Sequence, residues 1–133
     1  MSSTVLIATD ADEVHDEVDA ALAGPDTTVA RVTRGDVVRA AVQEVDPDLV
    51  VLDLQIGNMG GMATCMDLRL EEGADRLPPQ RVLMLLDRPA DTFLAKRSGA
   101  DGWLIKPVDA LRLRRAAEAI LAGGTYTEAA ATA

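Results

Sequence analysis

The sequence predicts an α/β fold in which five helices cover both faces of a five-stranded parallel sheet. Three observations support this fold class. Five strand-sized apolar runs recur along the chain, segments with helical spacing separate them, and glycines stand where most of these segments end. Strict alternation of strand and helix favours right-handed crossovers, which place helices on both faces of the sheet.

The expected strands are short runs rich in valine, isoleucine and leucine. Several of them are apolar without alternation, which is typical of strands that are buried on both faces. The five runs span residues 4–10, 27–32, 48–54, 81–87 and 102–106.

The segments between the strands carry apolar residues at the three- and four-residue spacing of a helix with one buried face. The expected fourth helix, about residues 90–97, is short and weakly patterned, and we expect it to be the most mobile. The residues expected to face the core are Val14, Val18, Ala21 and Leu22 in the first helix, Val38, Ala41, Val42 and Val45 in the second, Met62, Met66 and Leu70 in the third, and Ala110, Leu113, Ala117, Ile120 and Leu121 in the fifth.

Length and charge restrict the possible functions. The 133 residues fit one domain, assigned here to residues 1–124, with residues 125–133 as a flexible tail. The net charge of −9 repels phosphate backbones and anionic lipids, which argues against direct binding of nucleic acid or a membrane surface. The single cysteine, Cys65, excludes an internal disulfide, and no leader or 18-residue apolar span is found. We therefore expect a cytoplasmic protein.

Charged side chains follow the first, third and fifth expected strands. Asp10, Asp53 and Lys106 stand at these three carboxyl ends, where ligand sites form in open parallel sheets. If the three strands are neighbours, the side chains converge on one pocket. Two close carboxylates repel each other unless a divalent cation neutralises them, and a set of oxygen ligands suits Mg²⁺.

The same residues carry a resemblance to a known family, the receiver domains of two-component response regulators, over roughly residues 4–122. Asp53 and the loop after it, "LQIGNMGG", resemble the family's phosphoacceptor aspartate and the loop that follows it. Asp10 resembles the second acid of a pair after the first strand. The stretch "SGADGWLIKP", residues 98–107, is similar to the fifth-strand signature, with Lys106 before Pro107, which is expected to follow a cis bond.

This resemblance implies a CheY-like fold with strand order 2-1-3-4-5. It implies that Asp53 accepts a phosphoryl group from a histidine kinase or a small phosphodonor, with Lys106 binding a phosphoryl oxygen. It also implies Mg²⁺ bound by Asp10, Asp53 and the backbone carbonyl of Gln55. Such a module is no enzyme beyond its own phosphorylation and dephosphorylation. It signals through a downstream protein partner or a homodimer.

Two positions depart from the family's pattern. Thr9 stands where the first acid of the pair is expected, which removes a charge from the Mg²⁺ site. The serine or threonine expected after the fourth strand is Leu86, or Asp87 if the alignment shifts by one residue. Neither side chain donates to a phosphoryl group, and losing such a hydrogen bond costs about 1.5–3 kcal/mol. We therefore expect slow phosphorylation of Asp53 or weak coupling to Trp103, which occupies the family's aromatic switch position.

Other functions stay open at this point. A pseudo-receiver, folded alike but regulated without phosphate, is favoured by Thr9 and Leu86. An aspartyl phosphatase needs a second acid two residues after its nucleophile, and Gln55 occupies that position. A flavodoxin-type FMN protein needs a loop of hydroxyls and amides after the first strand, whereas this chain has the acidic stretch "TDADE" there.

Overall fold

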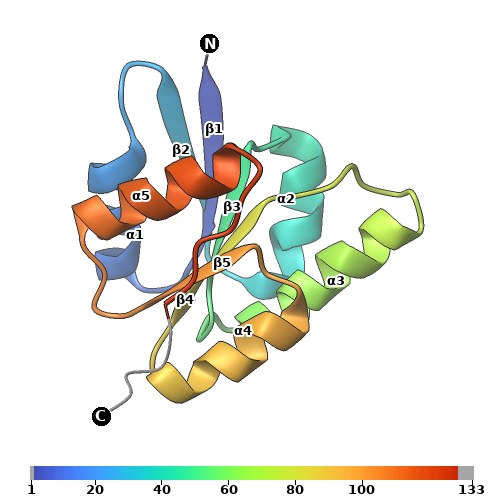
Figure 1. Cartoon of the computed structure of the whole chain (residues 1–133). Helices are drawn as coiled ribbons and strands as arrows, with labels where there is room; N and C mark the ends of the chain where they lie inside the picture. Colours follow the sequence, from blue (N-terminus) through green and yellow to red (C-terminus); the bar gives the residue numbers. More distant parts are fainter. Residues whose placement is uncertain (1, 129–133) are drawn as a thin grey trace.

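The computed structural model describes residues 2–128 as one α/β unit built around a single parallel sheet (Figure 1). The sheet has five strands in the order β2-β1-β3-β4-β5, which confirms the predicted fold and strand order. The strands are β1 (Ser3–Ala8), β2 (Thr27–Val32), β3 (Leu49–Asp53), β4 (Val82–Leu86) and β5 (Gly102–Ile105). None of the helices formed within residues 2–128 is both long and apolar enough to cross a bilayer.

The helices form two layers. One layer consists of α1 and α5, which pack against each other, and the other contains α2, α3 and α4 (Figure 1). The helices are α1 (Asp12–Leu22), α2 (Val38–Val45), α3 (Gly61–Gly73), α4 (Thr92–Ser98) and α5 (Ala110–Leu121), with short 3₁₀ turns η1 (Gly35–Val37) and η2 (Pro89–Asp91) leading into α2 and α4.

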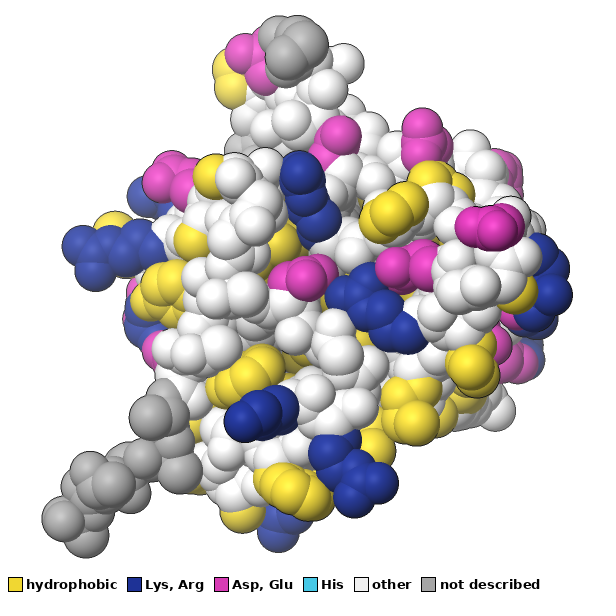
Figure 2. Space-filling view, turned by 45° about the vertical axis from the view of Figure 1, so that its right-hand side comes forward, with side chains coloured by type: hydrophobic (Ala, Val, Ile, Leu, Met, Phe, Trp, Pro, Cys, Tyr) yellow, Lys and Arg dark blue, Asp and Glu magenta, His cyan; other side chains and the backbone are white. Residues whose placement is uncertain are grey.

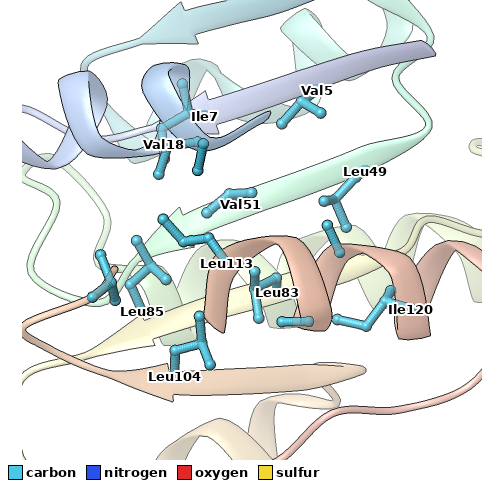
Figure 3. Close-up of a cluster of buried hydrophobic side chains, with 14 of the residues drawn as sticks. Val5, Ile7, Val18, Leu49, Val51, Leu83, Leu85, Leu104, Leu113 and Ile120 are labelled. Carbon is cyan, nitrogen blue, oxygen red and sulfur yellow. The ribbon is translucent and has the colours of Figure 1, made fainter. Parts of the chain in front are cut away.

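Alternating side chains of the central strands build a hydrophobic core on each face of the sheet. Figure 3 shows the core beneath α1 and α5, where Val51 and Leu85 from the sheet lie close to Leu113. Leu52 and Leu86 point to the opposite core, beneath α2, α3 and α4. The strands β1, β3, β4 and β5 end one or two residues earlier than predicted, so that Thr9, Asp10 and Asp87 lie just beyond the last strand residues, whereas β2 has the predicted bounds.

The inward face predicted for α3 is wrong. Met66 and Leu70 are exposed, at 44% and 70% of their full accessibility, whereas Cys65 and Leu68 are buried. The buried face also includes Glu71, whose carboxylate is paired with arginines. A polar residue can occupy a core-facing position when its charge is compensated, and apolar spacing alone cannot reveal this.

The segment expected to be a flexible tail lies beside β5 over residues 125–128. Tyr126 forms a parallel bridge with Gly102, and the Trp103 amide donates to the Tyr126 carbonyl at 2.9 Å. A Cβ atom at Gly102 would lie 2.4 Å from the Tyr126 carbonyl oxygen, so glycine permits this close approach. The rest of the expected tail, residues 129–133, lies outside the described residues.

Candidate functional site

The carboxyl edge of the sheet brings the three predicted site residues together. Asp10, Asp53 and Lys106 line one open cleft of about 560 Å³, together with Gln55 and Asp87. The parallel register explains this convergence, because β1, β3, β4 and β5 are aligned side by side and end at the same edge. The cleft also contains Glu13 and Glu17 of α1, so negative charge dominates its walls.

Asp53 is the last residue of β3, and it is only 2% exposed. Its carboxylate is nevertheless fully engaged. Oδ1 accepts hydrogen bonds from Lys106 Nζ at 2.6 Å and from the Gln55 amide at 3.1 Å, and Oδ2 accepts from the Thr9 hydroxyl at 2.7 Å. These donors compensate for the burial of the charge and hold the carboxylate in one orientation.

The glycine-rich loop after β3 packs against the end of that strand and contacts Asp10. A Cβ atom at Gly61 would lie 2.7 Å from the Asp53 carbonyl oxygen, so only glycine lets α3 begin directly against the end of β3. In the same loop, the Gly57 amide donates to Asp10 Oδ2 at 3.2 Å, and Asn58 has a positive φ of 53°. The sequence "IGNMGG" thus folds back and ties Asp10 to the loop after β3.

Lys106 follows β5, and its ammonium group lies between two carboxylates. Nζ is 2.6 Å from Asp53 Oδ1 and 3.2 Å from Asp87 Oδ1. Burial alone would lower the pKa of Lys106, but the hydrogen bonds and charges of Asp53 and Asp87 outweigh it and raise this pKa above its usual value. Lys106 is therefore the positive charge of the cleft. The peptide bond to Pro107 is cis, as expected.

Two contacts of the site did not follow from the sequence reasoning. Thr9 was noted as a missing acid, yet its hydroxyl serves as a hydrogen-bond donor to Asp53. The contact between Asp87 and Lys106 was also missed. Like Asp10 and Asp53, Asp87 stands at the carboxyl end of a strand, and this position was a signal that could have identified it.

Leu86 and Asp87, the two residues that could align with the expected serine or threonine, lie in different surroundings. Leu86 is fully buried in the core beneath α2, α3 and α4, whereas Asp87 lines the cleft. Trp103 is half-buried and packs against the same core as Leu86, and its indole N–H donates to the Glu128 carbonyl at 3.0 Å.

The oxygen atoms of the cleft are compatible with Mg²⁺. Asp10 and Asp53 present carboxylates to one cleft, and Mg²⁺ commonly uses one or two carboxylates and retains several waters. Within residues 2–128, no group of three or more histidine, cysteine or acidic residues has the geometry of a complete protein metal site. The role of the Gln55 carbonyl as a ligand stays a prediction.

Comparison with known proteins supports the interpretation of the fold and identifies the family. A family model described as the response regulator receiver domain matches residues 5–118. The DNA-binding response regulator MtrA of Mycolicibacterium smegmatis is 31% identical over 107 residues, which are 80% of this chain and 45% of that protein. The chain thus spans a little under half the length of this curated relative.

Solved structures show the same architecture. The BeF₃-activated receiver domain of RstA from Klebsiella pneumoniae has a TM-score of 0.77 and 26% identity, over 89% of this chain and 97% of that one. The chemotaxis response regulator CheY4 of Vibrio cholerae has a TM-score of 0.78 at 22% identity, over 90% and 99% of the two chains, and supports the fold alone. From its matched family model, its relatives and its sheet topology, the chain belongs to the response regulator receiver domains of two-component systems.

Proposed function

We propose that this receiver domain accepts a phosphoryl group on Asp53, from a histidine kinase or a small phosphodonor, in the cytoplasm. The observation that supports this most is the environment of the Asp53 carboxylate, which is buried, oriented by donors from three residues and open to a cleft. A carboxylate held in this way is a suitable nucleophile. The modified domain would then signal through a protein partner or a second copy.

In the proposed reaction, one oxygen of the Asp53 carboxylate attacks the phosphorus atom. A new P–O bond forms to Asp53 while the P–O bond to the leaving group breaks, and the leaving group keeps the electron pair. Lys106 is hydrogen-bonded to the Asp53 carboxylate, so its ammonium group is close enough to donate instead to an oxygen of the transferred phosphoryl group. Asp10, Asp53 and the Gln55 carbonyl would hold Mg²⁺, which, when bound, offsets the negative charge of the transferring group.

The departures from the family's pattern predict slow transfer. Thr9 supplies a hydroxyl instead of a carboxylate, and Leu86 is buried in the core and offers no donor. The negative side chains around the cleft also disfavour an incoming phosphate. A domain whose chemistry is limited to its own phosphorylation is not an enzyme in the usual sense. We therefore assign it a role in signalling.

The experiment is to incubate the protein with acetyl phosphate and Mg²⁺ and to follow the intact mass. Wild type should gain one phosphoryl group slowly, and Asp53→Asn should gain none. Without Mg²⁺, or in Asp10→Asn, the rate should fall at least about tenfold, as expected for loss of charge compensation. If wild type takes no label under conditions that label a typical receiver domain, or if Asp53→Asn is labelled equally, the proposal is wrong.

A further inference from the structure

Asp87 lies in the cleft just beyond the end of β4. Asp53 is paired with Leu85 in the sheet, so β3 and β4 end at the same edge, and the residue that follows the end of β4 lies beside the end of β3. Asp87 is that residue, and it lines the cleft. Its carboxylate therefore stands beside the proposed phosphoacceptor.

Asp87 contacts the charge that the proposed reaction needs. Its Oδ1 lies 3.2 Å from Lys106 Nζ, which is also bonded to Asp53 Oδ1 at 2.6 Å. The second oxygen, Oδ2, is buried and has no hydrogen-bond partner among the described residues. Asp87 is thus incompletely compensated, and its strongest available partner is the ammonium group that Asp53 also uses.

Sharing one lysine between two carboxylates has two effects on an incoming phosphoryl group. The lysine is drawn toward Asp87 and is less free to move onto a phosphoryl oxygen. The negative charge of Asp87 also opposes the approach of a phosphate anion, and this repulsion acts at short range in a partly buried site. Glu13 and Glu17 add negative charge to the same cleft, but among the described residues the ion-pair partners of Lys106 are Asp53 and Asp87. Of the acids that line the cleft beside Asp53, Asp87 therefore is the one that combines both effects.

We propose that Asp87 is a positioning residue that restrains phosphorylation of Asp53 by holding Lys106 and by repelling the phosphodonor. The proposal rests on the proposed function, because it concerns the rate of that reaction. Removing the charge of Asp87 should release Lys106 for the phosphoryl group and lower the repulsion. A residue with a purely structural role would not produce a faster reaction when it is replaced.

The test compares initial rates of Asp53 phosphorylation by acetyl phosphate with Mg²⁺, followed by intact mass. Asp87→Asn keeps the shape and removes the charge, Asp87→Ala removes both, and Asp87→Glu keeps the charge. The matched control is Glu44→Gln, which makes the same charge change at an exposed position of α2 outside the cleft. Circular dichroism establishes that each variant is folded.

We expect Asp87→Asn and Asp87→Ala to react roughly tenfold faster than wild type, whereas Asp87→Glu and Glu44→Gln stay close to wild type. The advantage of Asp87→Asn should shrink in about 1 M salt, where the screening length is roughly 3 Å. Labelling of the Asp87→Asn and Asp87→Ala variants alone, without labelling of wild type, would support the restraint by Asp87 and would overturn the proposed function of the wild-type domain.

Three outcomes overturn it. If wild type is labelled and Asp87→Asn is no faster, the inference fails and the proposed function stands. Equal acceleration by Glu44→Gln would show an effect of net charge and not of Asp87. If neither wild type nor any Asp87 variant is labelled, the inference fails together with the proposed function.

Discussion

The Asp53 carboxylate is the most constrained charge in the cleft. Its two oxygens receive hydrogen bonds from Lys106, the Gln55 amide and the Thr9 hydroxyl, and these donors come from three separate segments of the chain. Only the lysine carries a charge. In the proposed reaction, moving Lys106 onto the phosphoryl group would leave Asp53 held by the two neutral donors, and these would keep the modified side chain oriented.

Substitutions at Leu86 test how the core responds to a hydroxyl at the position, at the end of the fourth strand, where the family has a serine or threonine. Its side chain is fully buried in an aliphatic core. Leu86→Thr should lower the free energy of unfolding by about 2–4 kcal/mol, because it removes buried apolar volume and places a hydroxyl among apolar neighbours. Urea unfolding followed by circular dichroism measures this change.

The matched control is Leu86→Val, because valine has nearly the shape of threonine without the hydroxyl. We expect Leu86→Val to cost about 1 kcal/mol, so that the hydroxyl accounts for the difference between the two variants. Equal stabilities of the two variants would mean that a polar partner is within reach of position 86, and that the core position described here is wrong.

At the residue scale, the sequence was enough to predict that Asp10, Asp53 and Lys106 meet. Each stands at or just beyond the carboxyl end of a strand, and the ends of parallel strands share one edge. It was not enough to predict the Thr9 and Asp87 contacts, because these depend on which way each side chain turns once the strand has ended. The periodicity that fixes side-chain direction inside a strand no longer applies there.

At the element scale, the segment at residues 125–128 completes the outer edge of β5. An edge strand exposes unpaired backbone groups, and here Tyr126 pairs with that edge. Glu128 fixes the end of the segment, since its carboxylate accepts from the Ile105 amide at 2.8 Å and forms an ion pair with Arg112. The polar composition of this segment predicted a frayed tail. Composition alone does not reveal that a free strand edge lies nearby.

Glu128→Ala tests whether this segment shields Trp103, the single tryptophan of the chain. The variant loses the Arg112 ion pair and the bond to the Ile105 amide, so the segment should detach and uncover the indole. We expect the fluorescence of Trp103 to shift to longer wavelength and its quenching by acrylamide to increase. Glu118→Ala, at an exposed position of α5, is the control and should leave both unchanged. An unaltered spectrum in Glu128→Ala would exclude this shielding.

The two helical layers differ in how well the sequence predicted them. In α5 the expected residues Leu113, Ala117 and Ile120 are buried, because that helix has one clear apolar face. In α3 the exposed residues Met66 and Leu70 formed the more conspicuous apolar pattern. Figure 2 looks onto a face of the molecule where hydrophobic side chains lie among arginine and lysine side chains. An apolar pattern predicts a helix, but it does not say which face of that helix is covered.

At the scale of the whole molecule, the net negative charge and the individual ion pairs change the free energy of unfolding in opposite directions as the pH falls. The net charge is −9 at pH 7 and the isoelectric point is about 4.4. Acidification toward pH 4.4 therefore relieves repulsion between carboxylates, which favours the folded state. Below that pH the relief is exhausted, and the protonation of paired carboxylates determines the stability.

Among residues 2–128, three carboxylates have a lowered pKa in the folded state. For Glu71 the hydrogen bond from Arg76 is the main cause, and for Asp109 it is the hydrogen bond from the Arg112 amide. Burial acts to raise the pKa of Glu128, but bonds from Arg112 and the Ile105 amide outweigh it. A lowered folded-state pKa contributes stability above the unfolded-state pKa, and this contribution is lost as the pH falls through the folded-state value.

We therefore expect the free energy of unfolding to be highest near pH 5–6 and to fall steeply below about pH 4.5. Urea unfolding at a series of pH values measures this profile. Glu71→Gln should be less stable than wild type near neutral pH and should lose less on acidification, because glutamine has no charge to lose between Arg39 and Arg76. Parallel profiles for the two proteins would show that the Glu71 ion pairs do not contribute to the acid dependence.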